Sequence, residues 1–444
     1  MRLIEVDGSP GRVAELVDAL AAALDGGPPV LPVPVGARPG VTRAPAGTAV
    51  VIATSGSTGE PKLVALSAAA LRASARAAEA RLGGPGRWLL ALPAEHVAGV
   101  QVIVRALLAG AAPAVLDLRA GFRPDAFAAA TAALGPGRRY TSLVPTQLGR
   151  ILDAAGPGAQ HGAPAAAEVG AAPTAVEALR SYAAVLVGGA ALDPATRERA
   201  LAAGVRVVTT YGMSETAGGC VYDGVPLDGV TVDLDPDGRI VLGGPTLASG
   251  YLPPTAAADA AADGDAGDGD AGDATATADA GGGDVDDAGG DGNGAAAGER
   301  AGFVGGRFRT GDLGRWRDGR LEVLGRADDV IVTGGEKVAP AAVERVLAAQ
   351  PGVRAACVVG LPDPEWGQVV AAAVVWNAGA DPGAPTEPSA EPLREAVRAA
   401  LGRAAVPRRV VAVAEIPLRG IGKPDRAAVA RLVSAAADPH HPPR

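Results

Sequence analysis

Short apolar runs rich in β-branched residues alternate with alanine-rich helical patterns along the first half of this chain. We predict strands over residues 49–54, 88–92, 114–118, 184–187 and 205–210, and helices over residues 67–82, 97–109, 124–134 and 194–203. A parallel pair of strands needs a long crossover connection, which a helix usually supplies. The alternation therefore predicts an α/β architecture with a largely parallel sheet.

Beyond Tyr211 the pattern changes to short strands separated by turn residues. Residues 229–243 predict a hairpin around the turn Asp235-Pro-Asp-Gly238, and residues 315–325 repeat the design with a turn at Asp318-Gly319. We therefore expect a small β subdomain behind the sheet.

The last part of the chain has its own mixed pattern. It predicts strands over 329–333, 353–360, 369–376 and 409–414, and helices over 339–349, 392–401 and 425–436. A chain of 444 residues also exceeds the usual size of one domain. We predict a large N-terminal domain over residues 1–325 and a small, mobile α+β domain over residues 326–444.

An acidic segment of low complexity interrupts the N-terminal domain at residues 255–299. Residues 255–298 hold eleven aspartates and no Lys or Arg. The whole chain has a net charge of −9, so the chain without this segment has a net charge of about +2 (−9 + 11). The segment has too few large apolar residues to offset the entropy of ordering, which predicts a disordered insert. Gly-Asp pairs at 264 and 267 leave a calcium-binding repeat as an alternative. A near-neutral remainder argues against nucleic acid as a partner.

Two cysteines, Cys220 and Cys357, lie in different predicted domains, so neither a disulfide framework nor a zinc cluster is indicated. No apolar run approaches the ~20 residues that span a bilayer, and the N-terminus lacks the pattern of a signal peptide. We expect a cytoplasmic protein without a membrane span. His161 has no partner signal, and His440 and His441 lie in a Pro-rich tail.

A loop rich in glycine and hydroxyl residues, Thr54-Ser-Gly-Ser-Thr-Gly-Glu-Pro-Lys62, follows the first predicted strand of this half. Small residues let backbone N–H groups and hydroxyls converge on phosphate oxygens, and the lysine adds a positive charge. The loop is not the Walker form, because Glu60 and Pro61 separate the last glycine from the lysine. A surface turn is the alternative for such a motif taken alone.

Four later motifs occur with this loop in a fixed order. They are Tyr211-Gly-Met-Ser-Glu-Thr216, Thr310-Gly-Asp-Leu313, Gly325-Arg-Ala-Asp-Asp329 and Gly422-Lys-Pro-Asp425. The set resembles the acyl-adenylate-forming superfamily of acyl-CoA synthetases, adenylation domains and luciferases, over residues 50–430 apart from the insert. The segments 92–102, 141–147 and 187–192 are similar to those of the o-succinylbenzoate-CoA ligases of menaquinone biosynthesis.

The resemblance implies an AMP-forming acid–thiol ligase that uses ATP, Mg²⁺ and CoA. Lys423 matches the catalytic lysine that bridges the carboxylate and the α-phosphate, although Pro424 departs from the usual motif. Glu215 matches the Mg²⁺ ligand. The alternative is an N-cap pair in which Ser214 caps a helix and Glu215 complements the helix dipole, and this pair is compatible with the ligand role. The implied ATP site consists of Thr54, Ser55, Gly56, Ser57, Thr58, Gly59, Lys62, Gly188, Gly189, Ala190, Tyr211, Gly212, Ser214, Asp312 and Arg326.

The resemblance also assigns an acyl site and a hinge. His96 is the implied catalytic residue of the acyl site, which Gly99 and Gly218 would line, and Arg105 would offset the second carboxylate of a dicarboxylic acid. Asp328 matches the hinge about which the last domain turns. The glycines of the implied CoA channel are Gly334 and Gly335.

Three alternatives stay open from the sequence. An aryl- or fatty-acyl-CoA ligase would share every ATP residue and differ in the acyl pocket. An adenylation domain that serves a carrier protein is disfavoured, because no carrier module follows in this sequence. A non-catalytic nucleotide-binding protein is disfavoured by the intact Lys423, Glu215 and Asp312. The oligomeric state stays open, with a homodimer as one alternative; the N-terminal lobe is shorter than in most of the superfamily, which leaves in doubt the dimer contacts that the missing part would make.

Overall fold

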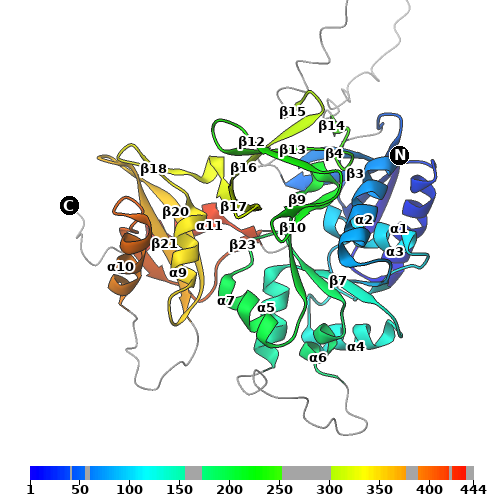
Figure 1. Cartoon of the computed structure of the whole chain (residues 1–444), viewed down its shortest axis with the longest axis horizontal. Coiled ribbons are helices and arrows are strands. Elements are labelled where there is room, and N and C mark those ends of the chain that lie inside the picture. The colour runs from blue at the N-terminus through cyan, green and yellow to red at the C-terminus, as the bar shows by residue number, and fades with distance from the viewer. Residues whose placement is uncertain are drawn as a thin grey trace, which may run out of the picture.

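The fold is known from a computed structural model (Figure 1). It describes residues 1–40, 43–55, 61–155, 173–252, 302–376, 389–419 and 423–436. The acidic insert, His161 and loop residues 56–60 lie outside the described residues.

The first sheet has five strands in the order β1-β2-β3-β4-β14. The pairs β1–β2 and β2–β3 are parallel, whereas β3–β4 and β4–β14 are antiparallel. The predicted phosphate loop, residues 54–62, therefore begins in β3 and ends in β4, which are antiparallel strands. The strands are β1 (Arg2–Val6), β2 (Val30–Pro34), β3 (Thr48–Ser55), β4 (Pro61–Ser67) and β14 (Gly250–Leu252).

The second sheet has seven strands in the order β11-β10-β9-β8-β7-β5-β6. The run β9-β8-β7-β5-β6 is parallel, which confirms the predicted α/β architecture, and β9–β10 and β10–β11 are antiparallel. The strands are β5 (Arg87–Leu90), β6 (Ala114–Val115), β7 (Arg139–Leu143), β8 (Ala184–Val187), β9 (Val207–Met213), β10 (Gly218–Tyr222) and β11 (Val225–Pro226).

Helices cover both faces of the second sheet. One core joins α1 (Pro10–Leu24), α2 (Ala68–Leu82) and α3 (Val97–Leu108) to side chains of both sheets, so these helices form a layer between the sheets. The sequence sets where α1 and α2 begin, because the side chains of Ser9 and Ser67 accept from Arg12 N and Ala70 N. The opposite face is covered by α4 (Pro124–Ala133), α5 (Pro145–Ala154), α6 (Ala175–Arg180) and α7 (Pro194–Ala202).

Both predicted hairpins are present and share a third sheet. The φ angles of Asp318 (50°) and Gly319 (72°) are positive, as the tight turn between β16 and β17 requires. The strands are β12 (Thr231–Leu234), β13 (Arg239–Gly243), β15 (Phe303–Val304), β16 (Arg307–Arg317) and β17 (Arg320–Arg326).

The C-terminal part follows a 3-10 turn, η3 (Ala327–Asp329), and forms the left lobe of Figure 1. Its sheet has the order β19-β18-β21-β20, with β22 parallel to β21. Helices α9 and α10 pack on one face and α11 on the other. The elements are β18 (Ile331–Thr333), β19 (Glu336–Val338), α9 (Pro340–Ala348), β20 (Val353–Asp363), β21 (Gly367–Trp376), α10 (Ala390–Leu401), β22 (Arg409–Ala412), β23 (Leu418–Arg419), β24 (Lys423–Pro424) and α11 (Arg426–Ala435).

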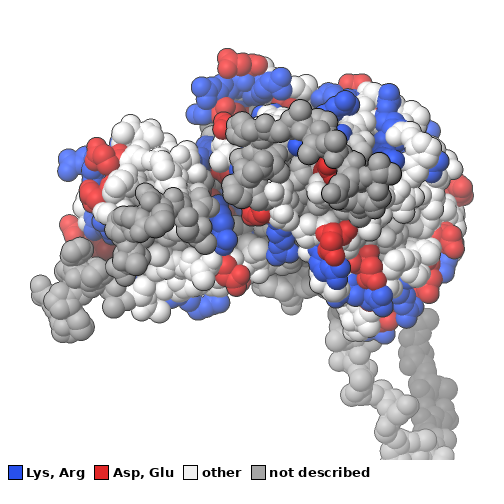
Figure 2. All heavy atoms as spheres, turned by 90° about the horizontal axis from the view of Figure 1, so that it is seen from below, with Lys and Arg blue, Asp and Glu red and all other residues white. Residues whose placement is uncertain are grey.

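Three general expectations concern the surface and the cysteines. Cys220 and Cys357 are free and buried, so they form no disulfide. Within the described residues, no helix has the length and apolar character needed to cross a membrane. Figure 2 shows Lys and Arg interspersed with Asp and Glu on the face that it presents, which fits the near-neutral balance calculated without the insert.

Candidate active site

The β3–β4 hairpin places the two ends of the phosphate loop side by side. Thr54 lies opposite Lys62 in the strand register, and Thr54 Oγ1 donates to the Lys62 carbonyl at 3.2 Å. The side chain of Lys62 is exposed, and its Nζ lies 5.3 Å from the centre of the Tyr251 ring. Of the other predicted loop residues, Ser55 is described only as part of β3. The predicted phosphate contacts of Gly56, Ser57, Thr58 and Gly59 fall outside the described residues.

Glu215 lies in a one-turn 3-10 helix, η2 (Ser214–Thr216), between β9 and β10. The hydroxyl of Tyr251 on β14 donates to Glu215 Oε1 at 2.6 Å. Burial, and after it the hydrogen bond to Glu215, raises the pKa of Tyr251. The hydroxyl therefore stays protonated and acts as the donor. The N-cap of η2 is Met213, so the alternative in which Ser214 caps a helix is wrong. Ser214 is instead buried in the turn itself.

The β9 strand carries Tyr211, whose hydroxyl donates to Asp312 Oδ2 on β16 at 2.8 Å. Burial, and after it the Asp312 charge, raises the pKa of Tyr211. Gly212 allows β10 to approach closely, because a Cβ there would lie 2.1 Å from the Gly218 carbonyl oxygen. Gly188 likewise sits where a Cβ would meet Thr210 Oγ1 at 2.2 Å. Gly189 and Ala190 follow Gly188 directly after β8.

His96 is the N-cap residue of α3 and makes no side-chain capping bond. Burial lowers its pKa, the Glu95 charge raises it, and the Lys423 charge lowers it. The net effect is a lowered pKa, so the imidazole is neutral at pH 7. Gly99 in the first turn of α3 is required by packing, since a Cβ would lie 2.2 Å from the Pro93 carbonyl oxygen.

Arg105 lies two turns further along α3 and is buried, with 6% of its surface exposed. Its Nη2 donates to the Tyr222 hydroxyl at 3.1 Å, and its guanidinium lies 5.2 Å from the centre of the Trp88 ring. The Nε atom is buried without a hydrogen-bond partner. The side chain is therefore not solvated, contrary to what is usual for a helix arginine, and the structure shows Tyr222 and Trp88 as its contacts. Its role toward an acid stays a prediction.

Gly218, the other predicted acyl-site glycine, begins β10 at φ 95°. A Cβ at this position would lie 3.1 Å from Gln101 Cγ on α3. The contact places the β9–β10 turn against α3.

Lys423 is exposed on the short ribbon of β23 and β24. The β23 strand lies between the two lobes in Figure 1. The charge of Lys423 contributes to lowering the pKa of His96, so the ammonium group lies within electrostatic reach of the start of α3. Its predicted role in catalysis stays a prediction.

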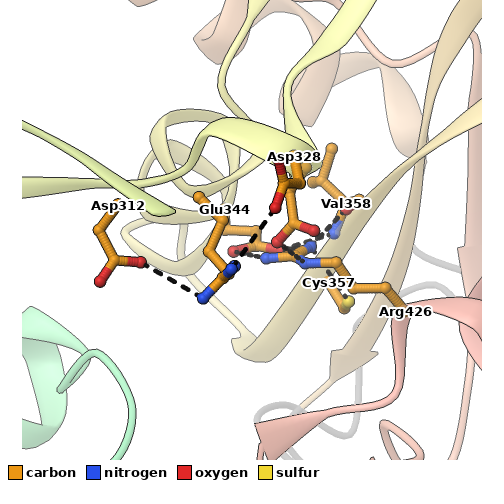
Figure 3. A network of polar contacts seen from close by, with 8 residues as sticks. Asp312, Asp328, Glu344, Cys357, Val358 and Arg426 are labelled. Carbon is orange, nitrogen blue, oxygen red and sulfur yellow. Dashed lines mark hydrogen bonds and ion pairs between the residues drawn. The ribbon is translucent and has the colours of Figure 1, made fainter. Parts of the chain in front are cut away.

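Arg326 joins the two parts through ion pairs with Asp312 and Asp328, which are both labelled in Figure 3. Its Nη1 lies 3.8 Å from Asp312 Oδ1, and its Nη2 lies 3.5 Å from Asp328 Oδ2 in η3. The predicted ribose ligand and the predicted hinge residue therefore share one arginine.

Gly334 and Gly335 form the β18–β19 turn at φ 56° and 84°.

Sequence reasoning missed Tyr251. It lies just before the acidic insert in a three-residue strand, where no motif marked it. Its role becomes visible only when β14 pairs with β4, because the pairing places its ring beside Lys62 and its hydroxyl on Glu215. A Gly-Tyr pair after a turn was the available signal.

Both parts of the chain match models of the AMP-binding enzymes. Residues 6–252 match the family model of the AMP-binding enzymes, and residues 342–423 match that of the AMP-binding enzyme C-terminal domain. The chain belongs to the AMP-binding enzyme family, which confirms the resemblance to adenylate-forming ligases.

Two similar proteins are named as 2-succinylbenzoate–CoA ligases. The "Probable 2-succinylbenzoate--CoA ligase" of Mycobacterium tuberculosis (strain H37Rv) is 42% identical over 393 residues, covering 88% of this chain and 86% of the relative. The 2-succinylbenzoate–CoA ligase of Geobacillus kaustophilus is 29% identical, with coverages of 97% and 80%.

Two solved structures share the fold. The amide bond synthetase McbA from Marinactinospora thermotolerans has a TM-score of 0.66 at 27% identity, covering 97% of this chain and 79% of McbA. The o-succinylbenzoate CoA synthetase of Bacillus subtilis in complex with the acyl-adenylate intermediate has a TM-score of 0.63 at 23% identity, with coverages of 86% and 69%. The mixed α/β fold predicted from the sequence is thereby confirmed.

Proposed function

We propose that this protein adenylates o-succinylbenzoate with ATP and transfers the acyl group to CoA, releasing AMP and pyrophosphate. The observation that carries the proposal is the cluster in which Tyr211, Asp312 and Arg326 are linked, and the effect of the Lys423 charge on the pKa of His96 supports it. The relatives named as 2-succinylbenzoate–CoA ligases support the choice of acid.

In the first step a carboxylate oxygen of the acid attacks the α-phosphorus of ATP, and the bond to pyrophosphate breaks. Negative charges crowd together in this step, so cations and oriented donors contribute most, about 3 kcal/mol for a single donor. We assign Lys423 to the attacking carboxylate and the α-phosphate. Lys62 and the loop would hold the outer phosphates, and Asp312 would accept from both ribose hydroxyls.

The residues present fit a magnesium ion. Mg²⁺ is usually held by one or two carboxylates together with substrate phosphates and water, and Glu215 offers one carboxylate fixed by Tyr251. No group of three or more His, Cys, Asp or Glu able to hold a metal occurs among the described residues, so the remaining ligands would come from ATP and water. When bound, Mg²⁺ would neutralise charge on the phosphates.

The acid would lie between His96 and the glycines Gly99 and Gly218. A neutral imidazole at the start of α3 can donate to or accept from the bound acid without competing for its charge. We assign the buried Arg105 to the second carboxylate of the acid, because its contacts among the described residues are Tyr222 and Trp88 and include no acidic side chain.

In the second step the CoA thiol attacks the acyl carbon and AMP leaves. We propose that the C-terminal domain, residues 326–444, first turns about Asp328, which withdraws Lys423 and brings Gly334 and Gly335 to the pantetheine arm. The separate cores of residues 331–433 support this division of the chain at 326.

The test is ATP-dependent thioester formation with a panel of acids, followed by AMP release. Thioester with o-succinylbenzoate at the highest kcat/KM supports the proposal. Preference for an aryl or fatty acid would assign the chain to the broader acyl-CoA ligases, and amide formation without CoA use would place it with amide bond synthetases such as McbA.

A further inference from the structure

Lys423 is supported by very little structure of its own. It lies on a two-stranded ribbon in which Arg419 pairs with Lys423 and Leu418 with Pro424, and its side chain is exposed. An ammonium group that must meet ATP and the acid at a fixed distance needs firmer support than such a ribbon gives. The first residue after Lys423 that several side chains hold is Arg426, at the start of α11.

Arg426 is the centre of a dense polar cluster in the C-terminal part (Figure 3). Its guanidinium makes two bonds to the Glu344 carboxylate on α9, at 2.6 and 3.2 Å, and Nη1 also donates to the Val358 carbonyl at 2.5 Å. Glu344 is held in turn by the Val358 amide at 2.8 Å. A planar guanidinium bound on two edges has little freedom to move.

A further bond of this cluster reaches the hinge. Arg426 Nε donates to Asp329 Oδ2 at 3.1 Å, and Asp329 directly follows the hinge residue Asp328 in η3. Asp328 faces the other way, toward Arg326 and the ribose-binding Asp312. Two arginines therefore hold the hinge turn from its two sides, one from the nucleotide site and one from the segment that carries Lys423.

We propose that Arg426 is a positioning residue that fastens the Lys423 segment to the C-terminal side of the hinge through Asp329. When the C-terminal domain rotates about Asp328, the Lys423 segment then moves with it as one rigid unit. The lysine therefore reaches the nucleotide site at one defined position. The inference rests on the proposed adenylation step. It assigns to the Arg426–Asp329 contact a part in the rate of that step.

The experiment compares four variants in the two half-reactions, acid-dependent pyrophosphate exchange and thioester formation from added acyl-adenylate. Arg426→Gln and Asp329→Asn remove the two ends of the hinge contact. Glu344→Gln weakens the packing of Arg426 on α9 and leaves the hinge contact. Arg431→Gln, on the exposed face of α11, is the matched control.

A misplacement of about 1 Å can lower a rate by about 10²-fold. We therefore expect Arg426→Gln and Asp329→Asn each to lower kcat of pyrophosphate exchange by about 10- to 10²-fold. The KM for ATP and the thioester half-reaction should stay near wild type, because Lys423 acts only in adenylation. The double variant should be no slower than the slower single variant. An Asp329→Asn protein with unchanged exchange, or an equal loss in both half-reactions with a lower melting temperature, would overturn the proposal.

A second readout needs neither acid nor turnover. The pair Lys423→Cys and His96→Cys can be joined by a short bismaleimide. Cys220 and Cys357 should stay unmodified, because burial raises the pKa of each to about 12. Adding Arg426→Gln should lower the yield of cross-link, and adding Arg431→Gln should not. Because this yield is independent of the substrate, an inactive wild type would refute the proposed function alone, whereas an unchanged yield would refute the positioning role.

Discussion

Removal of the Tyr251 hydroxyl isolates one contact of the candidate site. In Tyr251→Phe the ring that packs beside Lys62 is kept, and the bond of 2.6 Å to Glu215 Oε1 is lost. A hydrogen bond to a charged group contributes about 1.5–3 kcal/mol. Because Tyr251 is half-buried and its contact partly solvated, the lower end applies, which corresponds to about tenfold.

The change should weaken binding of Mg·ATP by this factor, because Glu215 no longer has a fixed orientation toward the ion. The assay is a titration of the protein with ATP at several Mg²⁺ concentrations, read by binding and by pyrophosphate exchange. Tyr182→Phe is the matched control, since its buried hydroxyl pairs with Thr131 on α4, in the core on the far side of the second sheet. An Mg·ATP affinity equal to wild type in Tyr251→Phe would refute the assignment of Tyr251 and weaken that of Glu215.

Three further predictions concern the lysine, the acid and the packing of α3. Lys423→Ala should lower pyrophosphate exchange by about 10²-fold or more and largely spare thioester formation from added adenylate; equal loss in both half-reactions would contradict its role. Arg105→Ala should raise the KM for o-succinylbenzoate far more than the KM for ATP, and an unchanged KM for the acid would remove it from the acyl site. Gly99→Ala should lower the free energy of unfolding by about 1–3 kcal/mol, measured by denaturant titration, because the new methyl group meets the Pro93 carbonyl; full stability would show that the α3 start can shift.

The elements with a strong period were predictable from the sequence. The predicted helix over 97–109 is α3, and the predicted strand over 184–187 is β8, because buried apolar residues at regular spacing leave few other solutions. The strand predicted over 114–118 is only two residues long. The first β-α-β unit, β1 to β2, and the β4 strand were not predicted, although β4 turns the phosphate loop into a hairpin connection.

The site was predictable where a motif carries it and not where long-range pairing builds it. Asp312 and Glu215 stand in motifs, and each accepts a hydrogen bond from a tyrosine hydroxyl. Their ligand roles stay predictions. Tyr251 and Arg426 act through contacts with residues 36 and 82 positions away, and such pairings follow from the tertiary fold alone. Arg105 also shows this limit, because its burial against Trp88 could not be read from its place on the predicted helix.

The central claim is that Lys423 of the C-terminal part shares a site with His96 of the N-terminal part. The most direct test is an NMR titration of the His96 imidazole, assigned with His96→Gln, in the wild type and in Lys423→Gln. Burial and the Lys423 charge lower the pKa of His96, so removal of that charge should raise the pKa, and Arg431→Gln should leave it unchanged. The same His96 pKa with and without the Lys423 charge would contradict the account.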